Sequence, residues 1–120
     1  KLNLGDGALD SAFGASGVIT TNPSSSGDVP RSILASSGTL YIAGRDLTLG
    51  RSAWRIEKRS ATDGSLTIAF GTGGVLTSDP NSSGGEAYAL ALDSSGLYVA
   101  GFGNAGGTSN DLWWIEKRTR

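Results

Sequence analysis

The chain has 120 residues, the usual length of a single domain, and a net charge of −1. It contains no cysteine, methionine or histidine, which excludes a disulfide, a thiolate nucleophile, an imidazole base and a zinc site. The balanced charge offers no basic surface for nucleic acid or an anionic membrane, and 19 glycines suit short strands joined by turns better than a helical bundle.

The predicted elements come in two sets because the sequence is one unit written twice. Residues 1–27 align with residues 58–84 without a gap, and about half of the aligned positions are identical. Further along, the Leu-Tyr-Ile-Ala-Gly run at residues 40–44 recurs as Leu-Tyr-Val-Ala-Gly at 97–101. A fixed period of this length is typical of repeat architectures. The sequence therefore predicts two units, residues 1–59 and residues 60–120.

Each unit is predicted to form four short strands. In chain order the first unit has strands at residues 17–21, 29–35, 40–44 and 53–60, and the second at 74–78, 86–93, 97–101 and 112–119. The second strand of each set is apolar with little alternation, which is typical of a strand covered on both faces. The fourth alternates, so Trp54 and Ile56 point one way and Arg55, Glu57 and Arg59 the other.

Four antiparallel strands per repeat favour a β-propeller blade, and a sandwich is the alternative. We expect strand 29–35 to be innermost and most buried, followed outward by 40–44, 53–60 and then 74–78 from the next unit. Strand 17–21 then has no preceding partner, and strand 112–119 has no outer neighbour. Unpaired strand edges attract another chain.

One segment carries a family resemblance. Residues 63–77, Asp-Gly-Ser-Leu-Thr-Ile-Ala-Phe-Gly-Thr-Gly-Gly-Val-Leu-Thr, and the matching residues 6–14 resemble the delta-sixty repeat family of bacterial propeller-like proteins. Thr67 departs from the family's second Asp, and Pro30-Arg31 interrupts its Ala/Leu strand. The resemblance implies an all-β fold of two tandem four-stranded propeller-type blades and an extracellular or cell-surface setting. It implies no defined catalytic residues.

Two blades are too few to close a propeller, which uses roughly 4–8. Their one mutual contact leaves two apolar faces bare. We therefore expect a non-enzymatic structural protein whose copies exchange the N-terminal strand of one with the C-terminal strand of another, in a ring or a fibre. The alternative is a fragment of a longer secreted propeller. The interface candidates lie on these two strands: Val18, Thr20, Trp114, Ile115 and Glu116.

The tryptophans raise a second possible function. Trp54 and Trp113 are equivalent and are predicted to lie in the core, whereas Trp114 takes the place of Arg55 and is predicted to be the exposed aromatic. Trp114 is then a subunit contact or a platform for stacking a sugar, the latter as part of a carbohydrate-binding, lectin-like propeller.

Other motifs favour structural roles. Residues 101–106 match the dinucleotide pattern G-x-G-x-x-G, but Thr108-Ser109-Asn110-Asp111 leads into a strand where the pattern needs a helix. Asp79, Glu86 and Asp93 form no dense cluster of the kind that binds calcium and are predicted to cap turns. No catalytic residue, cofactor or metal ligand is predicted. The apolar run at residues 87–92 is far shorter than the ~20 residues that span a bilayer, so no membrane insertion is expected.

Overall fold

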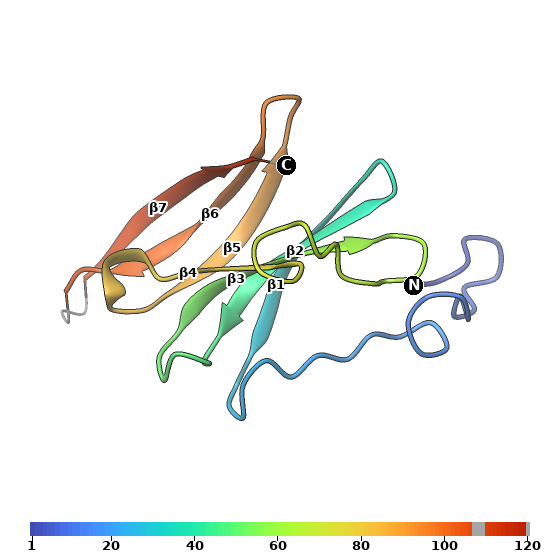
Figure 1. Cartoon of the computed structure of the whole chain (residues 1–120), viewed down its shortest axis with the longest axis horizontal. Coiled ribbons are helices and arrows are strands. Elements are labelled where there is room, and N and C mark those ends of the chain that lie inside the picture. Colours follow the sequence, from blue (N-terminus) through green and yellow to red (C-terminus); the bar gives the residue numbers. More distant parts are fainter. Residues whose placement is uncertain (107–109, 120) are drawn as a thin grey trace.

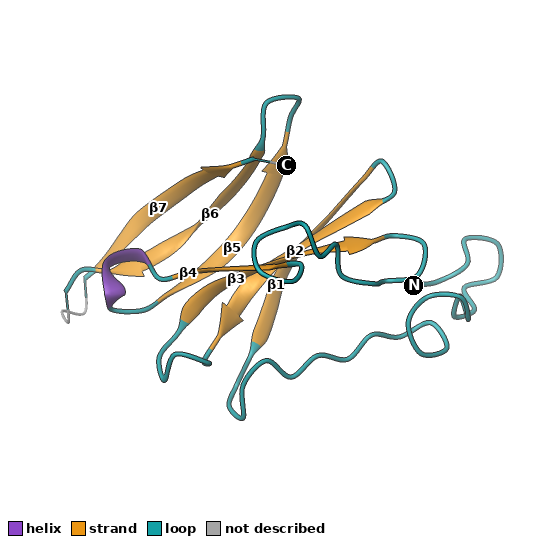
Figure 2. Ribbon diagram, viewed as in Figure 1, coloured by secondary structure: helices purple, strands orange, loops and turns teal. Residues whose placement is uncertain are grey.

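A computed structural model describes residues 1–106 and 110–119, and it confirms the expected all-β fold. Two antiparallel sheets pack against each other (Figure 1). Sheet 1 contains β1 (Val29–Ser36), β2 (Thr39–Asp46), β3 (Ala53–Ser60) and β4 (Val75–Ser78). Sheet 2 contains β5 (Gly85–Leu92), β6 (Leu97–Asn104) and β7 (Asp111–Arg118). The 3₁₀ turn η1 (Pro80–Ser82) lies between β4 and β5 (Figure 2).

The strand order of sheet 1 is the one that the repeat predicts. Its strands follow the order β1-β2-β3-β4, so the fourth strand comes from the second sequence unit. β4 pairs with β3 in a register that places Val75 opposite Glu57 and Ser78 opposite Trp54. Sheet 2 has the order β5-β6-β7, and within the described residues no strand pairs with the outer edge of β7.

The expected strand at residues 17–21 is wrong for the single chain. In the described structure these residues form only an isolated bridge, between Val18 and Ala15. The equivalent bridge, between Val75 and Thr72, continues into β4 because β3 lies beside it. Residues 18–21 have no such neighbour, and an extended segment without a ladder partner is not a strand.

Residues 1–18 nevertheless fold like residues 58–75. Backbone hydrogen bonds recur 57 residues apart, although only some of the residues that make them are identical in the two copies. The recurring bonds join Asn3 to Ala8, Phe13 to Asp10 and Gly17 to Phe13, and likewise Ser60 to Ser65, Phe70 to Thr67 and Gly74 to Phe70. The isolated bridge of Leu2 with Leu9 likewise matches that of Arg59 with Leu66.

Local chemistry sets the hairpins and a bulge. Ser37 and Gly38 connect β1 to β2 with φ angles of 48° and 75°, the positive values that a tight two-residue hairpin turn requires. The register shifts at equivalent places in both sheets, around Arg31 in β1 and around Tyr88 in β5. A bulge of this kind turns the extra side chain away from its ordinary face. Arg31 and Tyr88 therefore become available for contacts between sheets.

The core lies between the two sheets. Sheet 1 contributes Tyr41, Ala43, Trp54 and Ile56, and sheet 2 contributes Ala87, Leu97 and Val99, all of them buried. The side chains of β3 alternate as predicted, with Trp54 and Ile56 in this core and Arg55 on the opposite face. We call this packing of sheet 1 on sheet 2 the inner contact.

The prediction that strands 29–35 and 86–93 are the most buried is wrong. No residue of β1 is fully buried, and burial in β5 is confined to residues 85–87. Each is the first strand of its sheet, with no strand pairing at its outer edge among the described residues. Each sheet also buries only one face in the inner contact, so the central strands β2 and β3 are covered better.

The turn between β5 and β6 provides a prediction of pH dependence. The Asp93 carboxylate accepts hydrogen bonds from the hydroxyl and the amide of Ser95, both at 2.7 Å, and from the Gly96 amide at 3.0 Å. The bonds from Ser95 contribute most to lowering the pKa of Asp93 from 3.8 to about 2. A pKa lowered by folding stabilises the folded state above the unfolded pKa, and this stabilisation is lost as the pH falls through the folded value.

We therefore expect Asp93→Asn to lower the free energy of unfolding near neutral pH, with the difference from wild type vanishing as the pH approaches about 2. Urea unfolding followed by circular dichroism at a series of pH values measures this difference. A difference that stays constant down to that pH would contradict the assigned role of the carboxylate.

Candidate functional site

The outer face of sheet 2, away from the inner contact, is apolar and bare. It carries Tyr98, Ala100, Trp113 and Ile115, which follow from the register of β6 with β7. Trp113 is 94% exposed and Ile115 is 70% exposed. The four positions correspond in sequence to Tyr41, Ala43, Trp54 and Ile56, all of them buried in the inner contact.

The sequence prediction for the tryptophans is correct for Trp54 and wrong for the other two. Trp54 is 0% exposed, whereas the equivalent Trp113 lies on the bare face. Trp114 does point to the opposite face from Trp113, but that face is the inner contact, where Trp114 packs against the core. Its Nε1–H donates to Glu116 at 3.2 Å. Trp114 is therefore half-buried, and Trp113 is the free aromatic.

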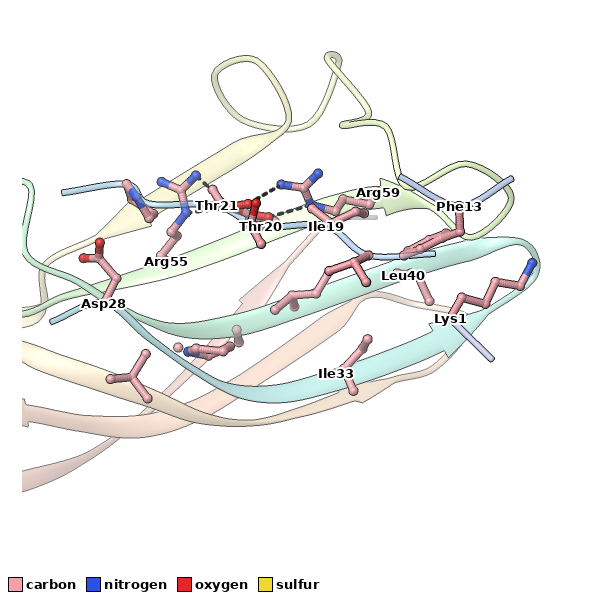
Figure 3. A pocket seen from close by; sticks show the side chains of 18 of the residues that line it. Lys1, Phe13, Ile19, Thr20, Thr21, Asp28, Ile33, Leu40, Arg55 and Arg59 are labelled. Carbon is pink, nitrogen blue, oxygen red and sulfur yellow. Dashed lines mark hydrogen bonds and ion pairs between the residues drawn. The ribbon is translucent and has the colours of Figure 1, made fainter. Parts of the chain in front are cut away.

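A cleft of about 640 Å³ lies over the other bare face, the outer face of sheet 1. Residues 17–21 form one wall, and β1 and β2 form another with Ile33, Leu40 and Ile42 (Figure 3). Leu40 and Ile42 correspond in sequence to Leu97 and Val99, which lie fully buried under sheet 1 in the inner contact. The cleft therefore exposes the same kind of surface that sheet 2 buries.

Charged side chains hold one side of the cleft in place. Glu57 is buried and accepts a hydrogen bond from Arg55 at 2.8 Å and another from Arg59 at 2.6 Å. Arg59 also donates to the Gly64 carbonyl at 2.9 Å and to the Thr21 hydroxyl at 3.2 Å. The last bond tethers residues 17–21 to sheet 1 (Figure 3).

The inner contact shows how a tryptophan fits such a surface. The Nε1–H of Trp54 donates to the carbonyl of Phe102 at 2.8 Å. The ring lies over Gly101, where an added Cβ would come within 2.9 Å of Cζ2 of Trp54. Glycine is needed here first because an added Cβ would come within 2.1 Å of the Glu86 carbonyl oxygen in the neighbouring strand, and the ring then covers the glycine from the other sheet. The equivalent glycine of sheet 1, Gly44, lines the cleft.

A cluster of ion pairs joins the two sheets at the bulge. The buried Glu86 lies 2.7 Å from Nε of Arg31 and 3.8 Å from Nε of Arg45, and it accepts a hydrogen bond from Tyr88 at 3.0 Å. Burial alone would raise the pKa of Glu86, but the hydrogen bonds from Arg31 and Tyr88 and the two positive charges outweigh burial and lower it. Glu86 is thus a structural contact between sheets, and the prediction that it caps a turn is wrong.

The predicted interface residues fall on two separate surfaces. Val18 and Thr20 line the cleft, and both are exposed. Ile115 lies on the outer face of sheet 2. Glu116 lies on the inner side, where it accepts a hydrogen bond from Ser78 of β4 at 2.7 Å. The chain does not bring the two sets together.

The remaining candidates have structural surroundings. Residues 101–104 belong to β6, β7 begins at Asp111, and none of the described residues 105, 106 and 110 is helical. Thr108 and Ser109 lie outside the described residues. Asp79 accepts a hydrogen bond from the Gly84 amide and pairs with Arg51, as expected of a turn cap. Within residues 1–106 and 110–119, acidic side chains form no group suited to a metal ion.

Comparisons with known proteins add no relative. No protein-family model, curated protein or solved structure matches the chain. In the described ranges, no helix has both the length and the apolar character required to cross a membrane.

Sequence reasoning missed three features of these surfaces. The cluster at Glu86 joins residues of the two units that are not equivalent in sequence, so the repeat gave no signal for it. The tether between Arg59 and Thr21 was also missed, although the recurring Glu-Lys-Arg motif marked one partner. Gly44 and Gly101 recur in the two copies and were a usable signal for the close approach of the neighbouring strand, because an added Cβ would lie 2.1 Å from the carbonyl oxygen of Val29 or Glu86.

Proposed function

We propose that this chain is a non-enzymatic structural protein whose copies assemble head to tail. The outer face of sheet 2 of one copy packs into the cleft over sheet 1 of the next. One observation carries the proposal: Trp54 is 0% exposed and its equivalent Trp113 is 94% exposed. A large apolar side chain that is exposed, although the equivalent residue of the other unit is buried, indicates a surface that binds a partner.

The two exposed faces correspond in sequence to the two faces that meet in the inner contact. The outer face of sheet 2 corresponds to the inner face of sheet 1, and the outer face of sheet 1 to the inner face of sheet 2. In the inner contact, Trp54 and Ile56 pack on Leu97 and Val99. In the proposed contact, Trp113 and Ile115 of one copy pack on Leu40 and Ile42 of the next. Here the ring of Trp113 lies over Gly44 and donates to the carbonyl of Arg45, as Trp54 does at Phe102.

Where the residues of the proposed contact differ from those of the inner contact, the residues on both partner surfaces differ together. The inner contact pairs Arg31 and Arg45 of sheet 1 with Glu86 of sheet 2. At the equivalent positions, the proposed contact brings Tyr88 and Phe102 of one copy to Val29 of the next. The ring centroids of Tyr88 and Phe102 lie 5.9 Å apart, with the ring planes tilted by 31°. Charge therefore meets charge in one contact and apolar surface meets apolar surface in the other.

The contact joins two different surfaces, so each added copy exposes a new surface for the next one. Repeated contacts form a ring if the rotation between neighbouring copies closes on itself, and a fibre if it does not. The sheets then play the part of propeller blades, in keeping with the resemblance to the delta-sixty repeat family. That resemblance also supports an extracellular or cell-surface setting for the assembly.

Light scattering across a range of concentrations tests the proposal. We expect the mass to rise above the 12.2 kDa of a single chain, because association buries both bare faces. Trp113→Glu should hold the mass at 12.2 kDa, since it places a charge in the contact.

Leu49→Glu is the matched control, because Leu49 is exposed but lies in the loop between β2 and β3 and does not line the cleft. This variant should assemble like wild type. A wild-type mass of 12.2 kDa at every concentration would overturn the proposal, and so would equal effects of the two substitutions.

A further inference from the structure

We infer that a second copy of the chain completes sheet 2 by adding its residues 18–21 as a fourth strand beside β7, with Val18 opposite Glu116. This inference rests on the proposed function and deepens it, because it fixes the register of the two copies.

The first observation is the difference between β3 and β7. The two strands share the Trp-x-Ile-Glu-Lys-Arg pattern, with Trp54 equivalent to Trp113 and Glu57 to Glu116. β3 has β4 on its outer edge, whereas no strand among the described residues covers that edge of β7. An uncovered strand edge presents unpaired backbone N–H and C=O groups to another chain.

The second observation is that residues 18–21 contact the facing sheet in the same way as β4. Thr21 is equivalent to Ser78, and both hydroxyls contact the facing sheet. The Thr21 hydroxyl accepts from Arg59 at 3.2 Å, and the Ser78 hydroxyl accepts from Arg118 at 3.3 Å. Residues 18–21 thus lie over sheet 1 as β4 lies over sheet 2. In the proposed contact, this position lies beside the β7 edge of sheet 2 of the other copy.

The register follows from the pairing inside the chain. Glu57 pairs with Val75 and Arg55 with Thr77. The equivalent pairs between copies are Glu116 with Val18 and Trp114 with Thr20. These residues include four of the five interface candidates that the sequence predicted.

The Gly17 carbonyl marks the end of the new strand. The backbone nitrogen of Lys58 donates to the Gly74 carbonyl at 3.0 Å, and that of Lys1 donates to the equivalent Gly17 carbonyl at 2.7 Å. In the assembly the amide of Lys117 of one copy donates to the Gly17 carbonyl of the other, since Lys117 follows Glu116 as Lys58 follows Glu57. Lys1 therefore moves aside when the strand is added.

Disulfide trapping tests the register, and the absence of native cysteine makes it selective. The bond from Lys58 to Gly74 makes the neighbouring pair, Glu57 with Val75, a non-hydrogen-bonded pair, in which side chains are closest. We expect Val18→Cys and Glu116→Cys, prepared as separate chains and mixed under mild oxidation, to form a covalent dimer. Its yield should far exceed that of either chain alone.

Val18→Cys mixed with Ile115→Cys is the control, because a shift of one residue turns the side chain to the other face of the sheet. Trapping of the shifted pair as fast as the matched pair would overturn the inference. If the wild-type mass rises but no matched dimer forms, the added strand is wrong and face packing stands. If the mass does not rise, the proposed function fails as well.

Discussion

Replacing Trp54 by alanine should lower the free energy of unfolding by about 3–5 kcal/mol, the usual cost of removing a large aromatic side chain from a core. Trp54 is 0% exposed, packs between the sheets and donates its Nε1–H to Phe102. Both the cavity and the lost hydrogen bond act in the same direction. Urea unfolding followed by circular dichroism, at a concentration where the chain is monomeric, gives the difference.

The chain supplies its own control for this prediction. Trp113→Ala removes the same side chain at the equivalent position, yet it should change the unfolding free energy of the monomer by less than about 0.5 kcal/mol, as is usual at exposed sites. Trp54→Phe should cost less than Trp54→Ala, because part of the ring volume remains. Equal losses for the two alanine variants would mean that Trp113 is buried within a single chain, which contradicts the account.

Replacing Glu57 by alanine should cost about 3 kcal/mol, because it leaves the charges of Arg55 and Arg59 without their shared buried partner. The cost is at the lower end for a buried ion pair, since both arginines keep other contacts. Arg55 lies 3.3 Å from Asp46, and Arg59 still donates to Gly64 at 2.9 Å. Chemical unfolding of the purified variant measures the loss.

Glu116→Ala is the matched variant, at the equivalent position of β7. The side chain of Glu116 is 12% exposed, but it pairs with one arginine, Arg118, whose side chain is 34% exposed. Its loss leaves one partly solvated charge unpaired instead of two buried ones, so it should cost less than the loss of Glu57. Glu57→Gln should recover part of the stability, because the amide oxygen still accepts a hydrogen bond. If the Glu57→Ala variant were more stable than the Glu116→Ala variant, the assigned arginine partners of the two carboxylates would be contradicted.

The repeat made much of the fold predictable. Equivalent turn residues gave the hairpins, and the offset of 57 residues led to the correct prediction that the outermost strand of sheet 1 comes from the second unit. Alternation along β3 correctly divided its side chains between two faces. These features depend on local patterns of residue types, which a single sequence is enough to show.

What could not be predicted depends on which surfaces meet. Sequence equivalence predicted that Trp54 and Trp113 are both buried, but burial requires a facing sheet, and only Trp54 has one within the chain. For the same reason residues 17–21 do not form a strand without a neighbour, although they align with residues 74–78, which contain β4. The cluster around Glu86 arises from a bulge that turns Arg31 toward the other sheet, which the pattern of apolar residues does not encode.

Oxidative footprinting of the wild-type chain, read by mass spectrometry at low and high concentration, tests the central claim most directly. At low concentration Trp113 should be oxidised readily and Trp54 hardly at all. At concentrations where the mass rises, oxidation of Trp113 should fall toward that of Trp54, while the exposed Leu49 remains unchanged. Oxidation of Trp113 at one rate across all concentrations would show that its face meets no partner, and the account of assembly would be wrong.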